Sequence, residues 1–413
     1  MSLPRWYPIA APMLTSIMRG VARWVLPKLR ERIEHAALQR SSIPARTPSR
    51  RRVLVHAASM GELEQCVPII DALVAQDASL EIIVSCSSPS GMRHALTLRQ
   101  CTAAVYHPFE SATDVVSFLD IVRPDAVVID RYDVWPLFVD ELHRRAIPIT
   151  LINATFPSAA RSILLRSVIA TTYSQLSQIT AVTSDDARLL SEFTGRSITV
   201  LPDSRVDRIL QRVASARETF EHLQRSTPTL IVGSSWDADI DILMPAISDL
   251  DAQTLRVIIV PHEPSEATLS NIESTLPCTR LSRATSSTEG HIVVDSVGAL
   301  LSLYALASAA YVGGGFGAGV HSVLEPAGYG IPLACGPRIE RSRDAADLLA
   351  AGACTVVSTP EQVKQWMNDV VLNAQERQRI GRIAQSYVAS RSGSSQRYAH
   401  EIYRIVSEQS SAA

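Results

Sequence analysis

The sequence predicts an α/β protein with two doubly wound parallel sheets, each in a Rossmann-like domain. Short apolar runs rich in β-branched residues alternate with helical patterns along most of the chain, which is typical of βαβ units. The pattern occurs twice, because residues 207–227 read as a charged helix between two sets of such runs. At 413 residues, the chain also exceeds the size at which one core usually stops growing.

The two sets of runs define the expected strands. The first set comprises residues 52–57, 80–86, 103–109, 125–130, 147–153, 179–184 and 197–203. The second set comprises residues 229–235, 255–262, 291–296, 309–315, 331–336 and 354–358. We therefore expect an N-terminal domain (51–206), a connector (207–227) and a C-terminal domain (228–390) that face a central cleft. Residues 391–413 are expected to form a helix that crosses back towards the N-terminal domain.

Composition and motifs exclude several classes of protein. Hydrophobic residues make up 46% of the chain and charged residues 19%, which is normal for a globular protein. The six cysteines form no CxxC pair, so we expect reduced thiols in a cytoplasmic protein and no structural zinc. No GxGxxG follows the first strand and no GxxxxGK[ST] occurs anywhere, which argues against dinucleotide oxidoreductases and P-loop enzymes.

The first 50 residues differ from the rest of the chain. Residues 1–52 contain eleven Lys or Arg against two Glu, whereas the whole chain has a net charge of −2. This basic segment also contains Trp6, Met13 and Ile17, a combination that favours an anionic membrane surface over nucleic acid. Its uncharged stretch ends at residue 18 and is too short to span a bilayer. We expect an amphipathic membrane-associating segment; the alternative is a helix that packs on the protein's own core.

The loop after the first strand carries a candidate general base. It runs from His56 to Glu62, and an amphipathic helix follows. Glu62 is expected in the first turn of that helix, where a carboxylate can take a proton from an acceptor hydroxyl. In the alternative interpretation, Glu62 only complements the helix dipole after an N-capping Ser59.

The loop after the fourth strand, residues 130–136, combines two carboxylates, a guanidinium and two aromatic rings. Arg131 suits an acidic sugar or a phosphate, and Asp133 suits a hydroxyl or a developing positive charge. The alternative is an ion pair beside a core Trp135. In open parallel sheets, ligands bind at the carboxyl ends of strands, so this loop and the first are expected to open on the same site.

A glycine-rich loop, residues 313–319, precedes a helix expected to start near Val320. A glycine run that enters a helix offers bare backbone N–H groups to a phosphate. Glu325, one turn into the helix, suits ribose hydroxyls. The loop is a weak signal alone, but the combination of the glycine run, His321 and Glu325-Pro326 is much more specific.

These motifs together resemble those of the Kdo (3-deoxy-D-manno-octulosonic acid) transferases of lipopolysaccharide synthesis, which use CMP-Kdo and have the two-lobed GT-B fold. The likeness runs from about residue 50 to 400, and the basic N-terminus resembles the family's membrane anchor. The HAxSxGE motif of the family appears as residues 56–62, where the glutamate is the general base. The TELWP loop corresponds to residues 132–136, and there Asp133 takes the place of an acidic residue that stabilises the transition state. The GNxK segment resembles residues 202–205, so Arg205 takes the place of a basic residue that helps the leaving phosphate.

The resemblance also implies the remaining binding residues. The expected donor-binding residues are Pro261, His262, Val297, Gly298, Ala299, Gly314, Gly315, His321, Ser322, Val323, Leu324 and Glu325. The expected acceptor-binding residues are Ser59, Gly61 and Arg131. The chain departs from the commonest family pattern at Asp133 (usually Glu), Pro202 (Gly), Arg205 (Lys), Ala299 (acidic) and Ser322 (Asn). Arg131 stands where the family often has an acid, and His262 where it often has Arg.

The resemblance therefore implies an inverting transfer of Kdo from CMP-Kdo to a hydroxyl of a lipid A precursor. The catalytic residues would be Glu62, Asp133 and Arg205, with no metal or cofactor, because Arg205 and a helix N-terminus can carry the phosphate. The expected partners are CMP-Kdo, the lipid A precursor and an anionic membrane surface at the cytoplasmic face of a Gram-negative inner membrane. One alternative is a GT-B enzyme that uses a UDP-sugar. The other is a catalytically inactive, membrane-associated scaffold of the same fold.

Overall fold

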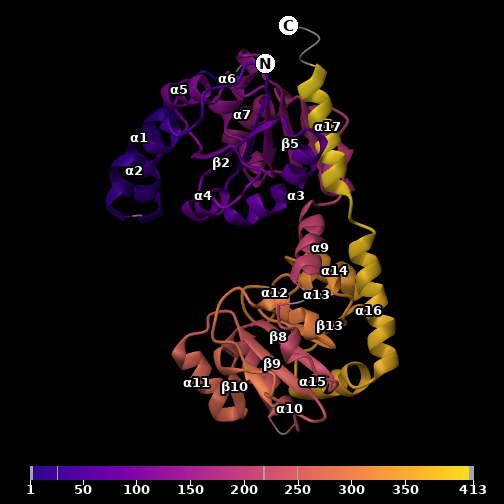
Figure 1. Cartoon of the computed structure of the whole chain (residues 1–413). Coiled ribbons are helices and arrows are strands. Elements are labelled where there is room, and N and C mark those ends of the chain that lie inside the picture. Colours follow the sequence, from indigo (N-terminus) through magenta and orange to yellow (C-terminus); the bar gives the residue numbers. More distant parts are fainter. Residues whose placement is uncertain (1–2, 26, 217–218, 249, 409–413) are drawn as a thin grey trace. The chain divides into compact units, whose positions relative to one another are not determined.

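The computed structural model describes residues 3–25, 27–216, 219–248 and 250–408. The chain divides into two compact units, which we call unit 1 (residues 1–208 and 392–413) and unit 2 (residues 209–391). Each unit is built around one parallel sheet, so two Rossmann-like doubly wound domains, as the sequence predicts, are confirmed (Figure 1).

Sheet A of unit 1 has seven strands in the order β3-β2-β1-β4-β5-β6-β7, and all of the pairs are parallel. The strands are β1 (Arg52–Ala57), β2 (Glu81–Cys86), β3 (Ala103–Tyr106), β4 (Ala126–Asp130), β5 (Ile149–Ala154), β6 (Gln178–Ala181) and β7 (Thr199–Val200). The chain builds outward from β1 to β3 and then returns to place β4 on the other side of β1. The switch point of this sheet therefore lies between β1 and β4.

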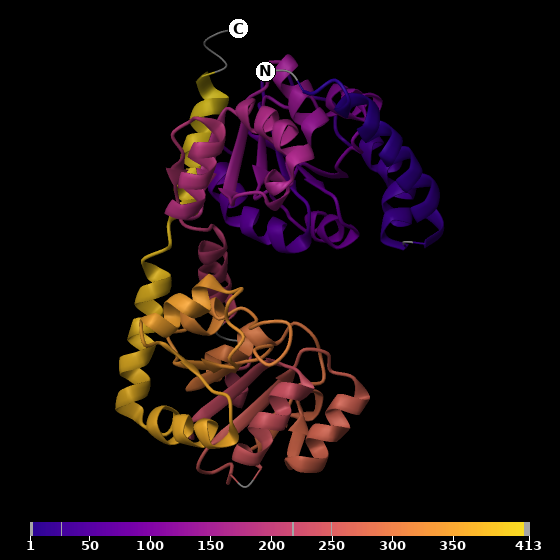
Figure 2. The same cartoon turned by 180° about the vertical axis from the view of Figure 1, so that it is seen from behind.

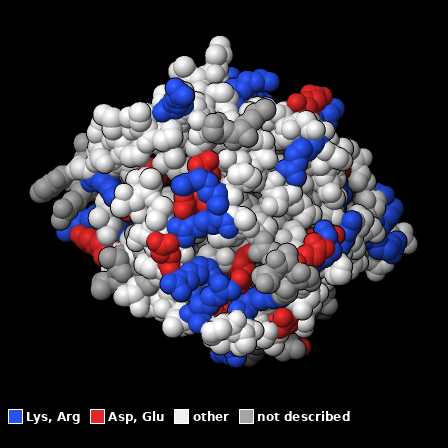
Figure 3. All heavy atoms as spheres, turned by 90° about the horizontal axis from the view of Figure 1, so that it is seen from above, with Lys and Arg blue, Asp and Glu red and all other residues white. Residues whose placement is uncertain are grey.

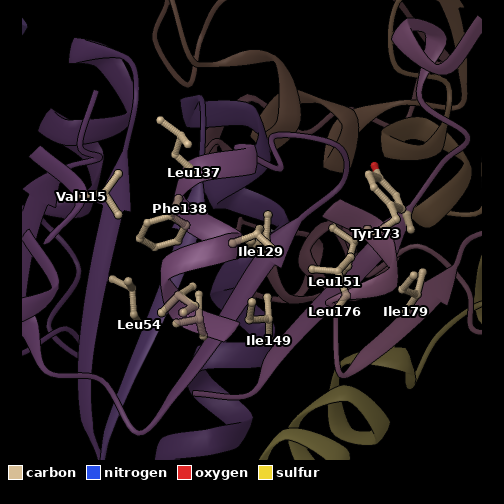
Figure 4. Close-up of a cluster of buried hydrophobic side chains, with 14 of the residues drawn as sticks. Leu54, Val115, Ile129, Leu137, Phe138, Ile149, Leu151, Tyr173, Leu176 and Ile179 are labelled. Carbon is tan, nitrogen blue, oxygen red and sulfur yellow. The ribbon is translucent and has the colours of Figure 1, made fainter. Parts of the chain in front are cut away.

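Helices cover both faces of sheet A. They are α3 (Met60–Gln76), α4 (Pro89–Ala95), α5 (Ala112–Val122), α6 (Pro136–Arg144), α7 (Ile163–Ser174), α8 (Ser184–Thr194) and α17 (Ser394–Glu408), with a 3-10 turn η1 (Ser158–Arg161). Alternate residues of one strand face opposite sides, so Leu54 packs with α5 and α6 while Val53 and Val55 pack with α3 and α17. Figure 4 shows the first of these cores, with Phe138 of α6 beside Leu54 and Ile129 of the sheet. Both faces of the strands are apolar because both are buried.

Sheet B of unit 2 repeats the arrangement, in the order β10-β11-β9-β8-β12-β13-β14. Its parallel strands are β8 (Thr229–Ser235), β9 (Arg256–Pro261), β10 (Cys278–Arg280), β11 (His291–Val293), β12 (Ala309–Val312), β13 (Leu333–Cys335) and β14 (Cys354–Val356). The switch point of this sheet lies between β8 and β12.

The helices of unit 2 follow the same alternation. They are α10 (Asp237–Ile247), α11 (Glu266–Thr275), α12 (Leu300–Leu303), α13 (Leu324–Gly328), α14 (Arg343–Ala350), α15 (Pro360–Trp366) and α16 (Ala374–Ala389). Short 3-10 helices are η2 (Glu221–Leu223), η3 (Leu281–Arg283) and η4 (Tyr304–Leu306), and η5 (Met367–Val371) is one π-helical turn. The core under α10 and α15 packs against β8 and β9, so unit 2 has a core of its own.

Two elements differ from the sequence prediction, namely the strand at residues 278–280 and the connector. Edge strand β10 has only three residues and no apolar alternation, so no pattern marks it. The region expected as one connector helix instead contains α9 (Arg205–Ala216), within which unit 1 ends, and then η2. Helix α17 belongs to unit 1, where it packs on α3 (Figure 1). Asp207 holds the start of α17 by accepting hydrogen bonds from Gly393 N at 2.6 Å and Ser395 N at 2.7 Å.

The basic N-terminal segment forms two helices, α1 (Tyr7–Val25) and α2 (Pro27–Ser41), which lie side by side (Figure 2). One face of α1 packs on unit 1: Tyr7 donates to Glu110, and Thr15 donates to the Glu110 carbonyl. The opposite face exposes the apolar side chains of Ile9, Met13, Leu14, Ile17 and Met18, and Trp6 just before the helix is exposed as well. Core packing and an exposed apolar face therefore coexist on the same helix. The side chains of residues 21–26 and 37–40, Trp24 among them, lie outside the described residues.

The charge of this segment is partly neutralised by the rest of unit 1. Arg19 pairs with Asp114 at 2.6 Å, and Arg46 pairs with Asp125. On the face shown in Figure 3, Lys and Arg side chains are interspersed with Asp and Glu. Over the described residues, the helices all lack the length and apolar character that a membrane-spanning segment requires.

Candidate active site

The candidate residues of unit 1 follow the two strands that flank the switch point. Residues 58–62 follow β1, and residues 131–135 follow β4, which is hydrogen-bonded to β1. Both loops therefore leave the same edge of sheet A at neighbouring positions, as the sequence predicts. In an open parallel sheet, this is the place where ligands bind.

Glu62 lies in the first turn of α3 and forms a capping box with Ser59. Its Oε2 accepts from Ser59 N at 3.1 Å, and its own N–H donates to Ser59 Oγ at 3.4 Å. The capping interpretation is thus confirmed, and it restricts the carboxylate to one orientation. A positioned carboxylate is also what a general base needs, so the cap does not exclude catalysis. Gly61, between the two, leaves α3 without a side chain at that position.

Asp133 lies in the loop after β4 and contacts side chains from β1 and the loop after β2. Its Oδ2 lies 2.8 Å from His56 Nε2 and accepts from Ser87 Oγ at 3.3 Å. The other ring nitrogen of His56 lies 2.9 Å from Ser85 Oγ. These contacts fix the carboxylate of Asp133 at the mouth of the switch point, although it comes from an irregular loop.

The environments of these two carboxylates shift their pKa values in opposite directions. Burial raises the pKa of Glu62, and the charge of Asp133 raises it as well, against backbone hydrogen bonds from Ala58 and Ser59. Burial also acts to raise the pKa of Asp133, but the hydrogen bond and charge of His56 outweigh it and bring that pKa below its usual value. A pair of groups with divergent pKa values is typical of an acid–base site. Glu62 therefore takes up a proton more readily than Asp133 does.

Arg131 is held inside unit 1. Its Nη2 donates to Asp203 at 2.7 Å and its Nε donates to Gln65 at 2.8 Å. The residue also adopts a positive φ of 61°, which turns its side chain towards these partners. Arg131 was expected to meet the acceptor, but two of its donor groups are used within the protein. Its charge is shared with Asp203, which also accepts from Arg205 N at 2.9 Å, so residues 131, 203 and 205 form one cluster.

A second layer of polar groups supports this cluster from below. Asn153 donates to Asp130 Oδ1 and to Ser204 Oγ, both at 2.7 Å. Ser204 in turn donates to the Gln65 carbonyl at 2.9 Å. Asn153 has a positive φ of 50°, and burial raises the pKa of Asp130 well above its usual value. This layer positions Arg205 at the first residue of α9, on the side of the switch point where Arg131 lies.

In unit 2, the glycine-rich loop follows β12 at the switch point of sheet B. Its glycines serve close packing: a Cβ on Gly314 would lie 2.4 Å from Gly319 O, and one on Gly315 would lie 2.6 Å from Gly336. The Gly314 N–H, expected to face a phosphate, instead donates to Asp239 Oδ2 at 2.9 Å. That part of the prediction is wrong, because a buried carboxylate of α10 already satisfies this amide.

The helix after the glycine loop is shorter than expected. It was expected to start near Val320, but α13 begins at Leu324 and has five residues. Residues 320–322 form no regular secondary structure, and His321 N donates to Gly313 O at 3.0 Å, which folds the loop back on itself. Glu325 lies in the first turn of α13, and its charge acts on the buried Tyr304 behind it. The backbone of Ser322, Val323 and Leu324 thus enters the helix directly beside the loop.

The remaining donor-binding candidates also lie at the carboxyl edge of sheet B. Pro261 ends β9, and the exposed His262 follows it. Val297 is 86% exposed, Gly298 has a positive φ of 96° and Ala299 caps α12. β9 and β12 flank β8 in the sheet, so the loops of residues 261–262 and 313–325 leave the same edge on either side of β8.

Four residues of these sites were not predicted as site residues. His56 and Ser87 hold Asp133, while Trp236 and Asp239 lie beside the glycine loop. All four lie at or just beyond the carboxyl end of a strand, and this position in the sequence is the signal that marks them. Among the described residues, no three His, Cys, Asp or Glu side chains are grouped so as to hold a metal ion.

The fold is that of nucleotide-sugar enzymes of the GT-B type. UDP-GlcNAc 2-epimerase from Neisseria meningitidis matches with a TM-score of 0.62 at 14% identity, over 85% of this chain and 99% of that one. MurG of Acinetobacter baumannii matches with a TM-score of 0.55 at 16% identity, over 86% and 99%. Identities this low define the fold and nothing finer.

The chain is similar in sequence to known enzymes over most of its length. Residues 28–208 match the family model of the 3-deoxy-D-manno-octulosonic-acid transferase (kdotransferase). The enzymes named 3-deoxy-D-manno-octulosonic acid transferase in Haemophilus influenzae and Bordetella pertussis are each 22% identical to this chain. They cover 86% and 88% of it, and 87% and 89% of their own lengths. The chain therefore resembles the Kdo transferase family of glycosyltransferases over most of its length.

Proposed function

We propose that this enzyme transfers Kdo from CMP-Kdo to a hydroxyl of a lipid A precursor, with inversion at the anomeric carbon. The observation that carries the proposal is the pair of carboxylates at the switch point of sheet A, whose pKa values are shifted apart. The relatives that share its sequence over most of its length are named for transfer of the same sugar.

The proposed chemistry assigns one task to each charged group of unit 1. Glu62, restricted by its capping box, removes the proton from the acceptor hydroxyl as the hydroxyl attacks the anomeric carbon. Asp133, ionised through its contact with His56, stabilises the positive charge that develops on the sugar. Arg205, at the start of α9, stabilises the leaving phosphate of CMP. Ser59 and Gly61, beside the base, are the proposed acceptor contacts.

The proposed donor site lies in unit 2, at the carboxyl edge of sheet B. His321 and the backbone of residues 322–324 serve the phosphate, and Glu325 accepts from the ribose hydroxyls. His262 and the loop of residues 297–299 complete the nucleotide pocket. No metal ion or cofactor is part of this proposal, because Arg205 and neutral N–H donors suffice for one phosphodiester charge.

Nucleotide binding tests the choice between CMP and UDP. We expect CMP to bind with measurable heat in calorimetry, and UDP to bind at least ~10-fold more weakly. Glu325→Ala should weaken CMP binding by roughly 1.5 to 3 kcal/mol, because charge-assisted contacts to the ribose are lost. An unchanged thermal midpoint serves as the folding control. Equal affinities for the two nucleotides would favour the alternative, a UDP-sugar enzyme.

We also propose that α1 docks on the cytoplasmic face of the inner membrane, where a lipid acceptor resides. The exposed apolar residues Ile9, Met13 and Ile17 repeat at intervals of four on one side of α1. The buried face of the same helix is held by Tyr7 and Thr15, so docking needs no rearrangement of unit 1. Such a helix lies in the interface plane of a bilayer, with its basic residues near anionic headgroups.

The exposed face of α1 can be tested without deleting the helix. We expect Ile9→Ser, Met13→Ser and Ile17→Ser together to lower partition to anionic vesicles at least ~10-fold, because three apolar side chains no longer enter the interface. Leu96→Ser removes an equally exposed apolar side chain from unit 1 and is the matched control. Partition should also fall as salt rises. A triple variant that sediments with vesicles like the wild type would restrict α1 to a packing role.

A further inference from the structure

Three aromatic rings from three different loops meet at the switch point of sheet B. Trp236 directly follows β8, His262 follows β9 and His321 follows the glycine loop. The ring of His262 stacks on Trp236 with centroids 4.3 Å apart and on His321 with centroids 4.6 Å apart. The planes of Trp236 and His321 differ by only 14°, and Trp236 Nε1 lies 3.0 Å from His321 Nε2. Trp236 is the one member of this group that has no role in the site described above.

The contact between Trp236 and His321 defines the tautomer of the histidine. The indole Nε1–H is a donor with no acceptor capacity, so His321 Nε2 must be the acceptor. A neutral imidazole that accepts at Nε2 carries its proton on Nδ1. Among the described residues, no hydrogen bond involves His321 Nδ1. The geometry therefore leaves one N–H donor of this ring for a ligand.

The surroundings keep His321 neutral in the absence of a ligand. Burial lowers its pKa, and the neighbouring His262 lowers it further, while Asp239 acts in the opposite direction. These two groups, His262 after β9 and Asp239 on α10, are the titratable groups that act on it. A cationic ring would also place an Nε2–H against the indole N–H, with no acceptor between them.

The carboxylate of Asp239 fixes the backbone around the rings of Trp236 and His321. Asp239, which is 1% exposed, accepts from Trp236 N and from Gly314 N, both at 2.9 Å. Its other oxygen accepts from Tyr311 at 2.9 Å. A Cβ on Gly314 would lie 2.9 Å from His321 Cδ2, so the imidazole packs directly on the loop. Trp236 and His321 are thereby tied to the same point, and their ring contact is preorganised.

We propose that Trp236 is a positioning residue for the nucleotide phosphate, because it holds His321 with Nδ1–H directed to a phosphate oxygen. The ligand class is a nucleoside monophosphate group, and the inference rests on the proposed function of this edge as the donor site. The role of Trp236 is distinct from base stacking, since its indole is paired in plane with His321 and covered by His262. Substitution should accordingly affect the phosphate and leave the nucleoside alone.

The test compares Trp236→Phe with the wild type, using CMP and cytidine as probes. Phenylalanine keeps an aromatic ring for His262 and removes only the N–H. We expect CMP affinity at pH 8 to fall about 10-fold in calorimetry, the loss of about one oriented hydrogen bond, while cytidine affinity is unchanged. The loss should shrink near pH 6, because the freed imidazole can take up a proton and donate from both nitrogens.

Two further measurements separate positioning from a structural effect. In a His321→Ala background, Trp236→Phe should have no additional effect on CMP affinity, since the two residues act through one contact. Long-range ¹H–¹⁵N spectra should show the Nδ1–H tautomer of His321 in the wild type and its loss in Trp236→Phe. Trp366→Phe, at a tryptophan of α15 in unit 2 whose Nε1 makes no hydrogen bond with any described residue, is the matched control for ring substitution.

The outcomes distinguish the inference from the proposed function. A wild type that binds neither CMP nor CMP-Kdo contradicts the donor site itself. A wild type that binds CMP, with Trp236→Phe equal to it at every pH, overturns only the role of Trp236. Equal losses for CMP and cytidine, or an Nε2–H tautomer in the wild type, overturn it as well.

Discussion

Glu62→Gln should lower kcat at least ~10²-fold while CMP affinity stays nearly unchanged, because the base is lost and the donor site lies in unit 2. The substitution is well matched to the structure. Glutamine at this position still accepts from Ser59 N, so the capping box of α3 is preserved and only proton uptake is removed. Steady-state kinetics with CMP-Kdo and a lipid A precursor, alongside calorimetry with CMP, measure both quantities.

The matched control is Glu62→Ala, which removes the base together with the hydrogen bond from Ser59 N in the capping box. If Glu62 serves as a base, both variants should be inactive, but only Glu62→Ala should lose stability, by about 0.5–2 kcal/mol. The pKa of Glu62 is raised, so the wild-type kcat/KM should decline as the pH falls through a value above its usual 4.5. Near-normal turnover in Glu62→Gln would restrict this residue to capping.

Asp133→Asn should lower kcat by about 10²- to 10³-fold, because a fixed negative charge beside the sugar is removed. The asparagine still accepts from His56 and Ser87, so the loop after β4 should keep its position. The pKa of Asp133 is lowered, and its charge is therefore present throughout the range in which Glu62 titrates. The acid limb of the wild-type pH profile belongs to Glu62. Asp133→Asn should lower the whole profile and move that limb to lower pH, because the charge that raises the pKa of Glu62 is removed.

A control for this variant is Asp203→Asn, which removes a carboxylate of the same unit that pairs with Arg131 rather than His56. We expect a smaller loss of kcat in Asp203→Asn. The asparagine keeps one oxygen, which can still accept the hydrogen bond from Arg205 N. An Asp133→Asn enzyme as active as the wild type, or one whose acid limb shifts with unchanged kcat, contradicts the charge-stabilising role.

The strand pattern was predictable because both sheets are buried on both faces, which forces apolar, β-branched runs at every central strand. Thirteen expected runs each contain a strand. Edge strand β10 was not predicted, because the three residues of Cys278–Arg280 are only half-buried and show no apolar pattern. The switch-point loops were predictable for a related reason: strand ends at the reversal of the strand order leave room for polar side chains.

The internal partners of the site residues were not predictable. The capping interaction of Glu62 follows from local spacing, but the contact of His56 with Asp133 joins strand β1 to a loop 77 residues further along the chain. Likewise, the glycine-rich loop suggested free N–H groups, and only the fold shows that Asp239 occupies the Gly314 amide. Arg131 was expected to face a ligand because the sequence does not show that Asp203 and Gln65 lie beside it. Local pattern identifies polar residues at strand ends, whereas tertiary structure decides which of them are already paired.

The most direct test of the account is to incubate the purified full chain with CMP-Kdo and a tetraacyl lipid A precursor, followed by mass spectrometry of the lipid. We expect the mass of the lipid to increase by one or more Kdo residues. The increase should depend on CMP-Kdo and be absent with Glu62→Gln. UDP-sugars in place of CMP-Kdo should leave the lipid unmodified. An unmodified lipid with CMP-Kdo, obtained with folded protein that binds CMP, would contradict the proposed transfer.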